Sequence, residues 1–212
     1  MNPFSYPKSK HVRREHPGAF ATYTKYKPAL RTEFLEKCVY CRRPDGGLSD
    51  DYGVDHYRPK SQFPALIASY TNLFYACNSC NRRKGGFWPS KEQLQDGLFV
   101  PNPCDHVMIE HLRYKHSCVE AKSSAGKFAL EMLDLNDPTL VKYRQALITI
   151  IDATESKLRE AYAIHKGRID QINSDADSVS TLDTDISKVQ QEIDRLRGAL
   201  RTLAGEDTQI TR

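Results

Sequence analysis

The chain has 212 residues, of which 39% are hydrophobic and 27% charged, and this composition excludes a disordered chain. No apolar run approaches the roughly 20 residues that cross a bilayer, and the first residues, MNPFSYPKSK, contain no apolar core of a secretory signal. We therefore expect a soluble cytoplasmic protein that makes no membrane contact, and in that compartment cysteine thiols stay reduced.

The net charge of +4 conceals an asymmetry along the chain. Residues 1–100 carry 16 Lys and Arg against 9 Asp and Glu, whereas residues 101–212 carry 15 against 18. A basic front half fits contact with a polyanion, although an ordinary solvated surface would give the same totals.

The N-terminal third begins irregularly. Residues 1–28 are rich in Pro, Lys, Arg and Tyr without a clear period, and we expect a basic N-terminal arm or an irregular cap. Residues 29–37 then place Leu30, Phe34 and Leu35 on one helical face, which predicts a short helix before the first cysteine pair.

The middle of the chain predicts short elements around the cysteines. Residues 52–57 (YGVDHY) predict a short strand, and the prolines that follow it force an irregular segment. We expect residues 71–76 (TNLFYA) to open as a helix-like turn into the second cysteine pair. Residues 109–114 and 117–121 predict a hairpin, and residues 127–135 predict a helix.

The C-terminal region has a helical period from about residue 139. Apolar residues recur in steps of three and four, as in the seam of a coiled coil, at Val179, Leu182, Ile186, Val189, Ile193, Leu196, Leu200 and Leu203. The polar stretch of residues 173–185 is a weak helix former and predicts a turn. We expect a helical hairpin or a long coiled coil, which either binds another subunit or braces the rest of the protein.

Two C-x-x-C pairs, separated by 35 residues, carry the strongest signal. Cys38 with Cys41 and Cys77 with Cys80 supply four thiolates for a tetrahedral zinc ion, because two intervening residues let both sulfurs of a pair face one ion. A site closed by four sulfurs has no open position, so the zinc is expected to be structural. The alternative is four buried thiols. Cys104 and Cys118 have no such partner.

A second constellation lies inside the loop that this zinc would close. His56 has an unperturbed pKa near neutrality and is a candidate general base. Asp55 and Asn81 provide hard oxygen ligands suited to Mg²⁺ or Mn²⁺. Adjacent residues of a strand point to opposite faces, so Asp55 and His56 can share one site only if the strand ends or bends there. Five cations close to these residues are candidate phosphate contacts: Arg58, Lys60, Arg82, Arg83 and Lys84.

These residues together resemble the HNH endonuclease family in its zinc-knuckle form. The resemblance rests on CVYC at 38–41, VDHYRPKS at 54–61 and NLFYACNSCNRRK at 72–84, and it covers roughly residues 30–90. It implies that His56 is the general base, that Asp55 and Asn81 are metal ligands, and that Asn72 braces the loop beside the base. Within the family, the extended pattern is similar to the nuclease subunits of Septu-type antiphage systems, which work beside an ABC-type ATPase; related pairs accompany some retrons.

The resemblance implies an α+β fold: a small ββα-metal core with a structural four-cysteine zinc site, followed by a mainly helical C-terminal region. We expect a basic arm at 1–28, a nuclease domain at 29–138, and a helical region at 139–212 that binds the partner ATPase. The implied activity is endonucleolytic hydrolysis of nucleic acid, with DNA favoured, using structural Zn²⁺ and catalytic Mg²⁺ or Mn²⁺. The alternative from the same residues is a zinc-stabilised module that binds nucleic acid, or serves as an adaptor, without turnover.

Overall fold

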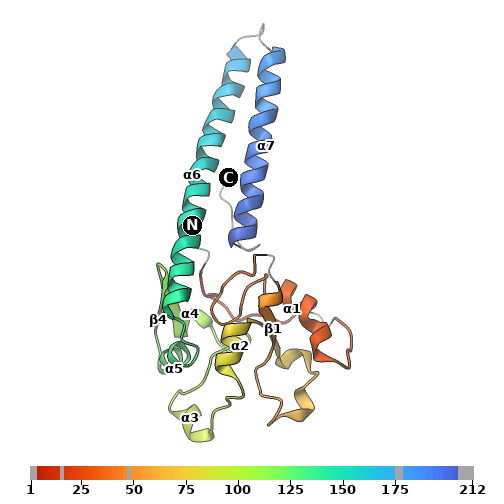
Figure 1. The fold of residues 1–212 in the computed structure, drawn as a ribbon, viewed down its shortest axis with the longest axis vertical. Coiled ribbons are helices and arrows are strands. Elements are labelled where there is room, and N and C mark those ends of the chain that lie inside the picture. Colours follow the sequence, from red (N-terminus) through yellow and green to blue (C-terminus); the bar gives the residue numbers. More distant parts are fainter. Residues whose placement is uncertain (1–3, 15–16, 47–48, 175–178, 205–212) are drawn as a thin grey trace.

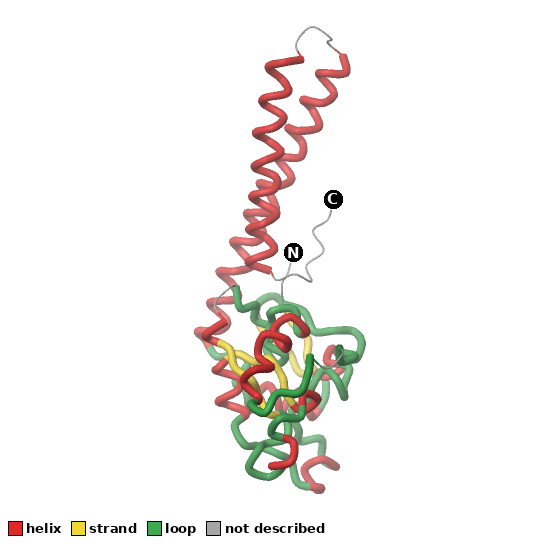
Figure 2. Tube along the Cα trace, turned by 90° about the vertical axis from the view of Figure 1, so that its right-hand side faces the viewer, coloured by secondary structure: helices red, strands yellow, loops and turns green. Residues whose placement is uncertain are grey.

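A small mixed domain carries a long antiparallel helical hairpin (Figures 1 and 2). The computed structural model describes residues 4–14, 17–46, 49–174 and 179–204. The helices are α1 Lys27–Glu33, α2 Asn78–Lys84, α3 Lys91–Gln95, α4 Met108–His111, α5 Ser124–Met132, α6 Pro138–Ser174 and α7 Val179–Ala204. The strands are β1 Tyr52–His56, β2 Leu73–Cys77, β3 Leu112–Lys115 and β4 Cys118–Ala121. This α+β architecture, with its helical C-terminal region, is the expected one.

Two antiparallel strands and a helix form the centre of the domain. Strand β1 pairs with β2 so that Tyr52 lies opposite Cys77 and His56 lies opposite Leu73, and α2 follows β2 without a connecting loop. The expected strand at 52–57 is confirmed. The expectation of a helix-like turn over residues 71–76 was wrong, because only the 3₁₀ turn Tyr70–Asn72 precedes strand β2. All five residues of β2 are buried, so its sequence lacks the alternation that identifies a half-exposed strand.

The helix expected at residues 29–37 ends earlier. Helix α1 stops at Glu33, because Leu35 and Glu36 adopt positive φ angles of 57° and 58°, which a right-handed helix does not allow. Phe34 is nevertheless buried, as the helical face predicted. The turn brings the chain back to the first cysteine pair.

The N-terminal segment belongs to the core of the domain. Tyr6 and Tyr26 are buried in the main hydrophobic cluster, and Phe4 is 1% exposed between the two long helices. The Tyr6 ring stacks on Tyr114 with centroids 5.3 Å apart. The expected arm is therefore a packed strap across the domain over its described residues.

The predicted hairpin and helix beyond residue 107 are present. Strands β3 and β4 are antiparallel, and Leu112 lies opposite Ala121. Helix α5 packs against α4 so closely that a Cβ at Gly126 would lie 1.8 Å from the His111 carbonyl oxygen, so this position requires glycine. Arg144 of α6 is buried and donates to the carbonyl oxygens of Ser117 at 2.6 Å and Leu135 at 2.7 Å. These bonds anchor the long helix α6 to the domain.

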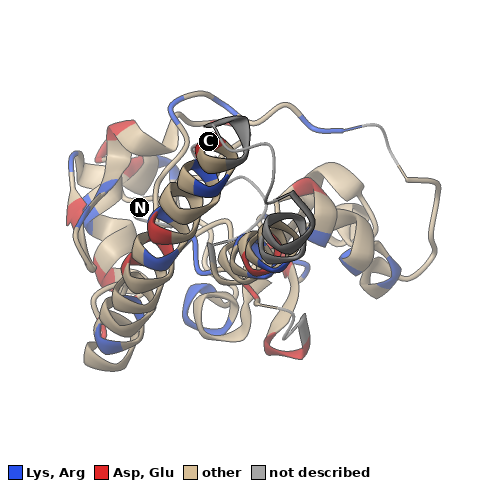
Figure 3. Cartoon of the chain, turned by 90° about the horizontal axis from the view of Figure 1, so that it is seen from above, with Lys and Arg blue, Asp and Glu red and all other residues tan. Residues whose placement is uncertain are grey.

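The C-terminal region is a helical hairpin within one chain. Its buried contacts are made by Leu147, Ile151, Leu158 and Ala161 of α6 with Ile193, Leu196 and Leu200 of α7. Residues 175–178, within the expected turn, lie outside the described residues, as do the side chains of the heptad positions Val179 and Leu182. Charges of both signs line the two helices (Figure 3). In the part of the chain that is described, no helix has the length and apolarity needed to span a bilayer.

Candidate zinc cluster and catalytic cavity

The four cysteines of the two C-x-x-C pairs meet at one point. The sulfur atoms of Cys38, Cys41, Cys77 and Cys80 all lie within 4.8 Å of one another, and all four residues are buried. The Cys41 and Cys77 sulfurs are 3.7 Å apart. Tetrahedral zinc with bonds of about 2.3 Å separates its sulfurs by about 3.8 Å, whereas a disulfide needs about 2.05 Å. The donor set and spacing therefore fit a zinc ion.

Backbone hydrogen bonds hold the two cysteine pairs in place. The amide of Val39 donates to the Tyr75 carbonyl oxygen at 3.0 Å, which joins the first pair to β2. Arg42 adopts a positive φ of 53°, and its amide donates to the Cys38 carbonyl oxygen at 2.9 Å. Burial raises the pKa of the Cys38 thiol, so thiolates at this position need a compensating cation.

A cavity of about 340 Å³ lies where the end of β1 meets α2. Asp55 and His56, at the end of β1, line it together with Asn81 of α2. The strand ends at His56, which is the condition under which two adjacent residues reach one site. Tyr23, Lys60 and Gly85 complete its rim, and Gly85 ends α2 with a positive φ of 52°.

The His56 ring is held in one orientation. Its Nε2 atom lies 3.0 Å from the carbonyl oxygen of Ile67. A carbonyl oxygen only accepts, so Nε2 carries the proton of the neutral ring and Nδ1 is left as the acceptor. Burial lowers the pKa of His56, an effect that the Ile67 carbonyl and Asp55 only partly oppose. The neutral ring with a free Nδ1 is the form that a general base requires.

The Asp55 carboxylate is buried between two donors. Lys84 Nζ lies 3.0 Å from its Oδ1, and the Tyr40 hydroxyl donates to its Oδ2. Lys84 Nζ also donates to the His56 carbonyl oxygen at 2.8 Å. Each carboxylate oxygen offers two lone pairs, so one position on each remains for a metal ion. With Asn81, this gives one carboxylate and one amide oxygen beside the cavity, a hard donor set that fits Mg²⁺ or Mn²⁺.

Asn72 fastens the loop that contacts His56. Its Oδ1 accepts from the Arg58 amide at 2.9 Å, while its Nδ2 donates to the carbonyl oxygens of Arg58 at 3.0 Å and Leu66 at 3.4 Å. These bonds link both ends of the loop that contains Ile67. Asn72 is thus placed to fix the loop, and it stays outside the cavity itself.

The five cations expected at phosphates fall into two groups. Arg58, Lys60 and Arg82 are exposed, and Lys60 lies on the rim of the cavity. Arg83 instead pairs with Asp134 and Asp137, each at 3.1 Å, and the Lys84 side chain is 1% exposed. The expected phosphate contact of Lys84 was therefore wrong. Its side chain is buried, and its charge is paired with the Asp55 carboxylate.

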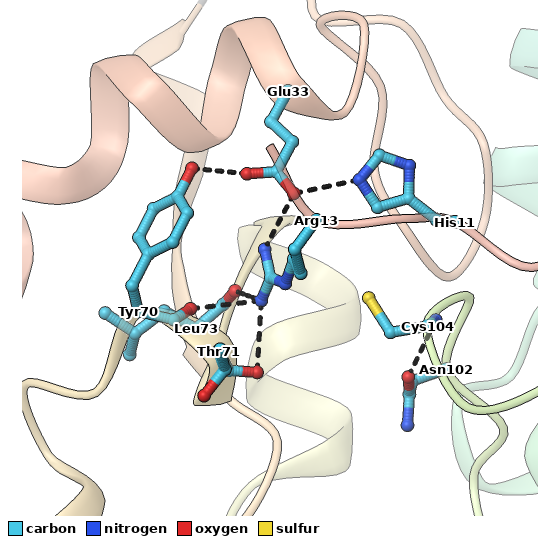
Figure 4. Close-up of polar contacts among 8 residues, drawn as sticks. All are labelled: His11, Arg13, Glu33, Tyr70, Thr71, Leu73, Asn102 and Cys104. Carbon is cyan, nitrogen blue, oxygen red and sulfur yellow. Dashed lines mark hydrogen bonds and ion pairs between the residues drawn. The ribbon is translucent and has the colours of Figure 1, made fainter. Parts of the chain in front are cut away.

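Arg13 of the N-terminal segment likewise pairs inside the domain (Figure 4). Arg13 lies 3.3 Å from Glu33 and donates to the carbonyl oxygens of Tyr70, Thr71 and Leu73, at the start of β2. Its guanidinium packs 4.6 Å from the ring centroid of Phe74. Arg13 therefore ties the N-terminal strap to the segment beside Asn72, which the sequence did not indicate.

Glu33 completes this cluster. Burial raises the pKa of Glu33, but hydrogen bonds from His11 and Tyr70 and the charge of Arg13 outweigh it and lower the pKa from 4.5 to about 2. Because the folded pKa is the lower one, the stabilisation is present above about pH 4.5 and is lost as the pH falls towards 2.

Replacing Arg13 with alanine is expected to destabilise the protein by about 3 kcal/mol at neutral pH, because it removes the positive charge that faces the buried Glu33 carboxylate and the donor to three carbonyl oxygens. Urea unfolding followed by circular dichroism measures this loss. The neighbouring Arg14 is exposed, so Arg14→Ala is a matched control that should stay within about 0.5 kcal/mol of the unaltered protein. Equal unfolding midpoints for the two variants would contradict the structural role of Arg13.

Two tyrosines that contact the side chains of His56 and Asp55 were not identified from the sequence. Tyr23 places its ring edge-on to the His56 ring, with the two centroids 4.6 Å apart. On the face of the Tyr23 ring, Lys60 Nζ lies 5.5 Å from the ring centroid. Tyr40 contacts Asp55 from within the first cysteine pair. Nothing in the irregular segment around Tyr23 marks it. Tyr40 had one available signal, its position between two metal-ligand candidates.

The paired strands, the following helix and the buried cysteine cluster together form the arrangement that the comparison with known families identifies. Residues 38–87 match the HNH endonuclease family model. The match contains both cysteine pairs, β1, β2 and α2, and it confirms the resemblance expected for this region. We refer to residues 38–87 as the HNH region.

A longer similarity relates the chain to a Septu protein. It is 30% identical over 126 residues to the Septu protein PtuB of Bacillus thuringiensis. The alignment covers 58% of this chain and 47% of PtuB, so the chain spans about half the length of the curated relative it matches. No solved structure matches the chain.

Proposed function

We propose that the protein is a metal-dependent HNH endonuclease that hydrolyses phosphodiester bonds of nucleic acid, with DNA as the favoured substrate. The observation that carries the proposal is the cavity lined by His56, Asp55 and Asn81 inside the HNH region. A base with a free ring nitrogen beside two hard oxygen ligands is what phosphodiester hydrolysis requires. The similarity to PtuB supports a role in antiphage defence.

The residues of the cavity divide the work of hydrolysis. His56 Nδ1 accepts a proton from a water molecule, whose oxygen forms the new bond to phosphorus while the bond to the leaving oxygen breaks and that oxygen takes a proton from solvent. Asp55 and Asn81 would hold the divalent cation. When bound, Mg²⁺ or Mn²⁺ would polarise the phosphate and offset its developing charge. Lys60 and Arg82 contact neighbouring phosphates without reading bases. A zinc ion bound by the four cysteines would hold β2 and α2 in place.

Incubation of the purified protein with single- and double-stranded DNA and with RNA tests this proposal. We expect cleavage when Mg²⁺ or Mn²⁺ is added and none in metal-free buffer. Nucleic-acid binding without cleavage, for every substrate and both metals, would instead support a zinc-stabilised binding module. The comparison of substrates also decides between DNA and RNA.

We further propose that the helical hairpin docks a partner, for which the resemblance to Septu-type systems implies an ABC-type ATPase. Support comes from apolar side chains of α6 that do not face α7. Tyr143, Ile150 and Ile164 are 40%, 50% and 51% exposed. Ile150 follows Tyr143 by seven residues and Ile164 follows Ile150 by fourteen, so the three lie on one side of the helix. We call these three residues the outer stripe.

The outer stripe can be tested with two matched double variants. Ile150→Lys combined with Ile164→Lys should reduce recovery of the ATPase in co-purification at least about tenfold. Docking would bury the two lysine charges in an apolar interface, which costs binding free energy. Thr149→Lys combined with Ala163→Lys changes exposed positions of equal spacing on another side of α6 and should retain the partner. Equal recovery with both pairs would exclude this surface. If the stripe instead joins two copies of the chain, light scattering of the protein alone will show a dimer that only the first pair dissociates.

A further inference from the structure

Two clusters in the domain each join a buried carboxylate to a buried tyrosine and a cation. In the first, Tyr40 and Lys84 contact the two oxygens of Asp55. In the second, the Tyr75 hydroxyl donates to Asp45 Oδ2 at 2.7 Å, and Arg31 pairs with the same carboxylate at 2.6 Å. Both tyrosines and both carboxylates are buried. Asp55 lines the cavity of the proposed active site and Asp45 does not, and the paired cation is the buried Lys84 in the first cluster and the partly exposed Arg31 in the second.

The position of Tyr40 gives the first cluster a further property. Tyr40 lies between Cys38 and Cys41, so its backbone is held by the cysteine cluster on both sides. The carbonyl oxygens of this segment are fixed as well: that of Tyr40 accepts from the Tyr6 hydroxyl at 2.9 Å, and that of Cys41 accepts from the Tyr114 hydroxyl at 2.7 Å. Tyr40 is 1% exposed, so its ring is enclosed by the domain.

We infer that Tyr40 is a positioning residue through which the zinc cluster orients the Asp55 carboxylate towards the catalytic cation. This rests on the proposed function. The Tyr40 hydroxyl occupies one oxygen of Asp55 and Lys84 occupies the other, so the carboxylate plane is fixed before a cation arrives. A carboxylate that is already oriented loses less freedom on binding a metal ion, and partners of this kind raise the affinity of metal ligands.

Tyr40→Phe isolates the hydroxyl and keeps the ring. We expect the variant to retain its zinc content and cooperative thermal unfolding, while the Mg²⁺ concentration for half-maximal cleavage rises about 10- to 100-fold. At saturating Mg²⁺ most of the cleavage rate should return. Electron paramagnetic resonance of added Mn²⁺ measures binding without cleavage and should show the same loss of affinity.

Tyr75→Phe is the matched control, since it removes the same hydroxyl from the same kind of buried carboxylate away from the cavity. Its thermal unfolding should shift as much as that of Tyr40→Phe, and its Mg²⁺ dependence should stay at the level of the unaltered protein. The inference is overturned if both variants shift the Mg²⁺ requirement equally, if neither does, or if Tyr40→Phe loses zinc, because the hydroxyl would then be a structural group. Absence of cleavage by the unaltered protein contradicts the proposed function itself, and the Mn²⁺ measurement still decides the role of Tyr40.

Discussion

Replacing His56 with alanine is expected to lower metal-dependent cleavage by about 10²- to 10⁴-fold, the contribution of a positioned general base. The ring is fixed by the bond from Nε2 to the Ile67 carbonyl oxygen, which leaves Nδ1 as its acceptor, and His56 lines the same cavity as Asp55 and Asn81. Alanine removes this acceptor and leaves the cysteine cluster and the Asp55 contacts unchanged. The rate of plasmid or oligonucleotide cleavage at fixed Mg²⁺ measures the effect.

The matched control for this variant is His106→Ala. His106 is also partly buried, burial lowers its pKa as well, and its Nδ1 lies 3.3 Å from a backbone carbonyl oxygen, that of Asn102, but it does not line the cavity. The His106→Ala protein should cleave at the rate of the unaltered protein. Zinc content and thermal unfolding should be equal for both variants. A His56→Ala protein that cleaves normally would remove His56 from the proposed mechanism.

Cys77→Ser is expected to abolish the folded HNH region. A structural zinc site in a small domain contributes roughly 10–16 kcal/mol, which equals or exceeds the total stability of about 5–15 kcal/mol typical of a domain. Cys77 ends β2 and directly precedes α2, the helix that carries Asn81. Loss of its sulfur would leave the junction between β2 and α2 without its metal bond. We expect the zinc content to fall and the cooperative thermal transition to disappear, as measured by elemental analysis and circular dichroism.

Cys118→Ser provides the comparison for the cysteine substitution. Cys118 is exposed on β4 and lies outside the four-sulfur cluster. The Cys118→Ser protein should retain one zinc per chain and unfold at the temperature of the unaltered protein. If Cys77→Ser also kept its zinc and its transition, the four sulfurs would be buried thiols, which is the alternative that the sequence left open.

The parts of the site that the sequence predicted are those that depend on local spacing. Two residues between cysteines are enough to turn both sulfurs towards one ion, and the structure confirms that the two pairs meet. The helical hairpin followed from a period of three to four residues, and the fold class followed from the family resemblance of the motifs. Asp55, His56 and Asn81 were singled out by chemistry and order alone, and the structure brings all three to one cavity. Their catalytic roles stay predictions.

Whatever depends on contacts between distant segments was decided by the tertiary structure. The segment at β2 is a strand because β1 pairs with it, and its continuous apolar run carries no period of its own. Lys84 and Arg13 carry the charge that a phosphate contact needs, yet each pairs with a buried carboxylate. Lys84 pairs with Asp55, and Arg13 pairs with Glu33. A cation in a sequence looks the same whether its carboxylate partner lies far along the chain or is absent. The sequence therefore determined which groups the protein possesses, and folding determined which of them face the cavity, because burial and pairing arise only when separate segments meet.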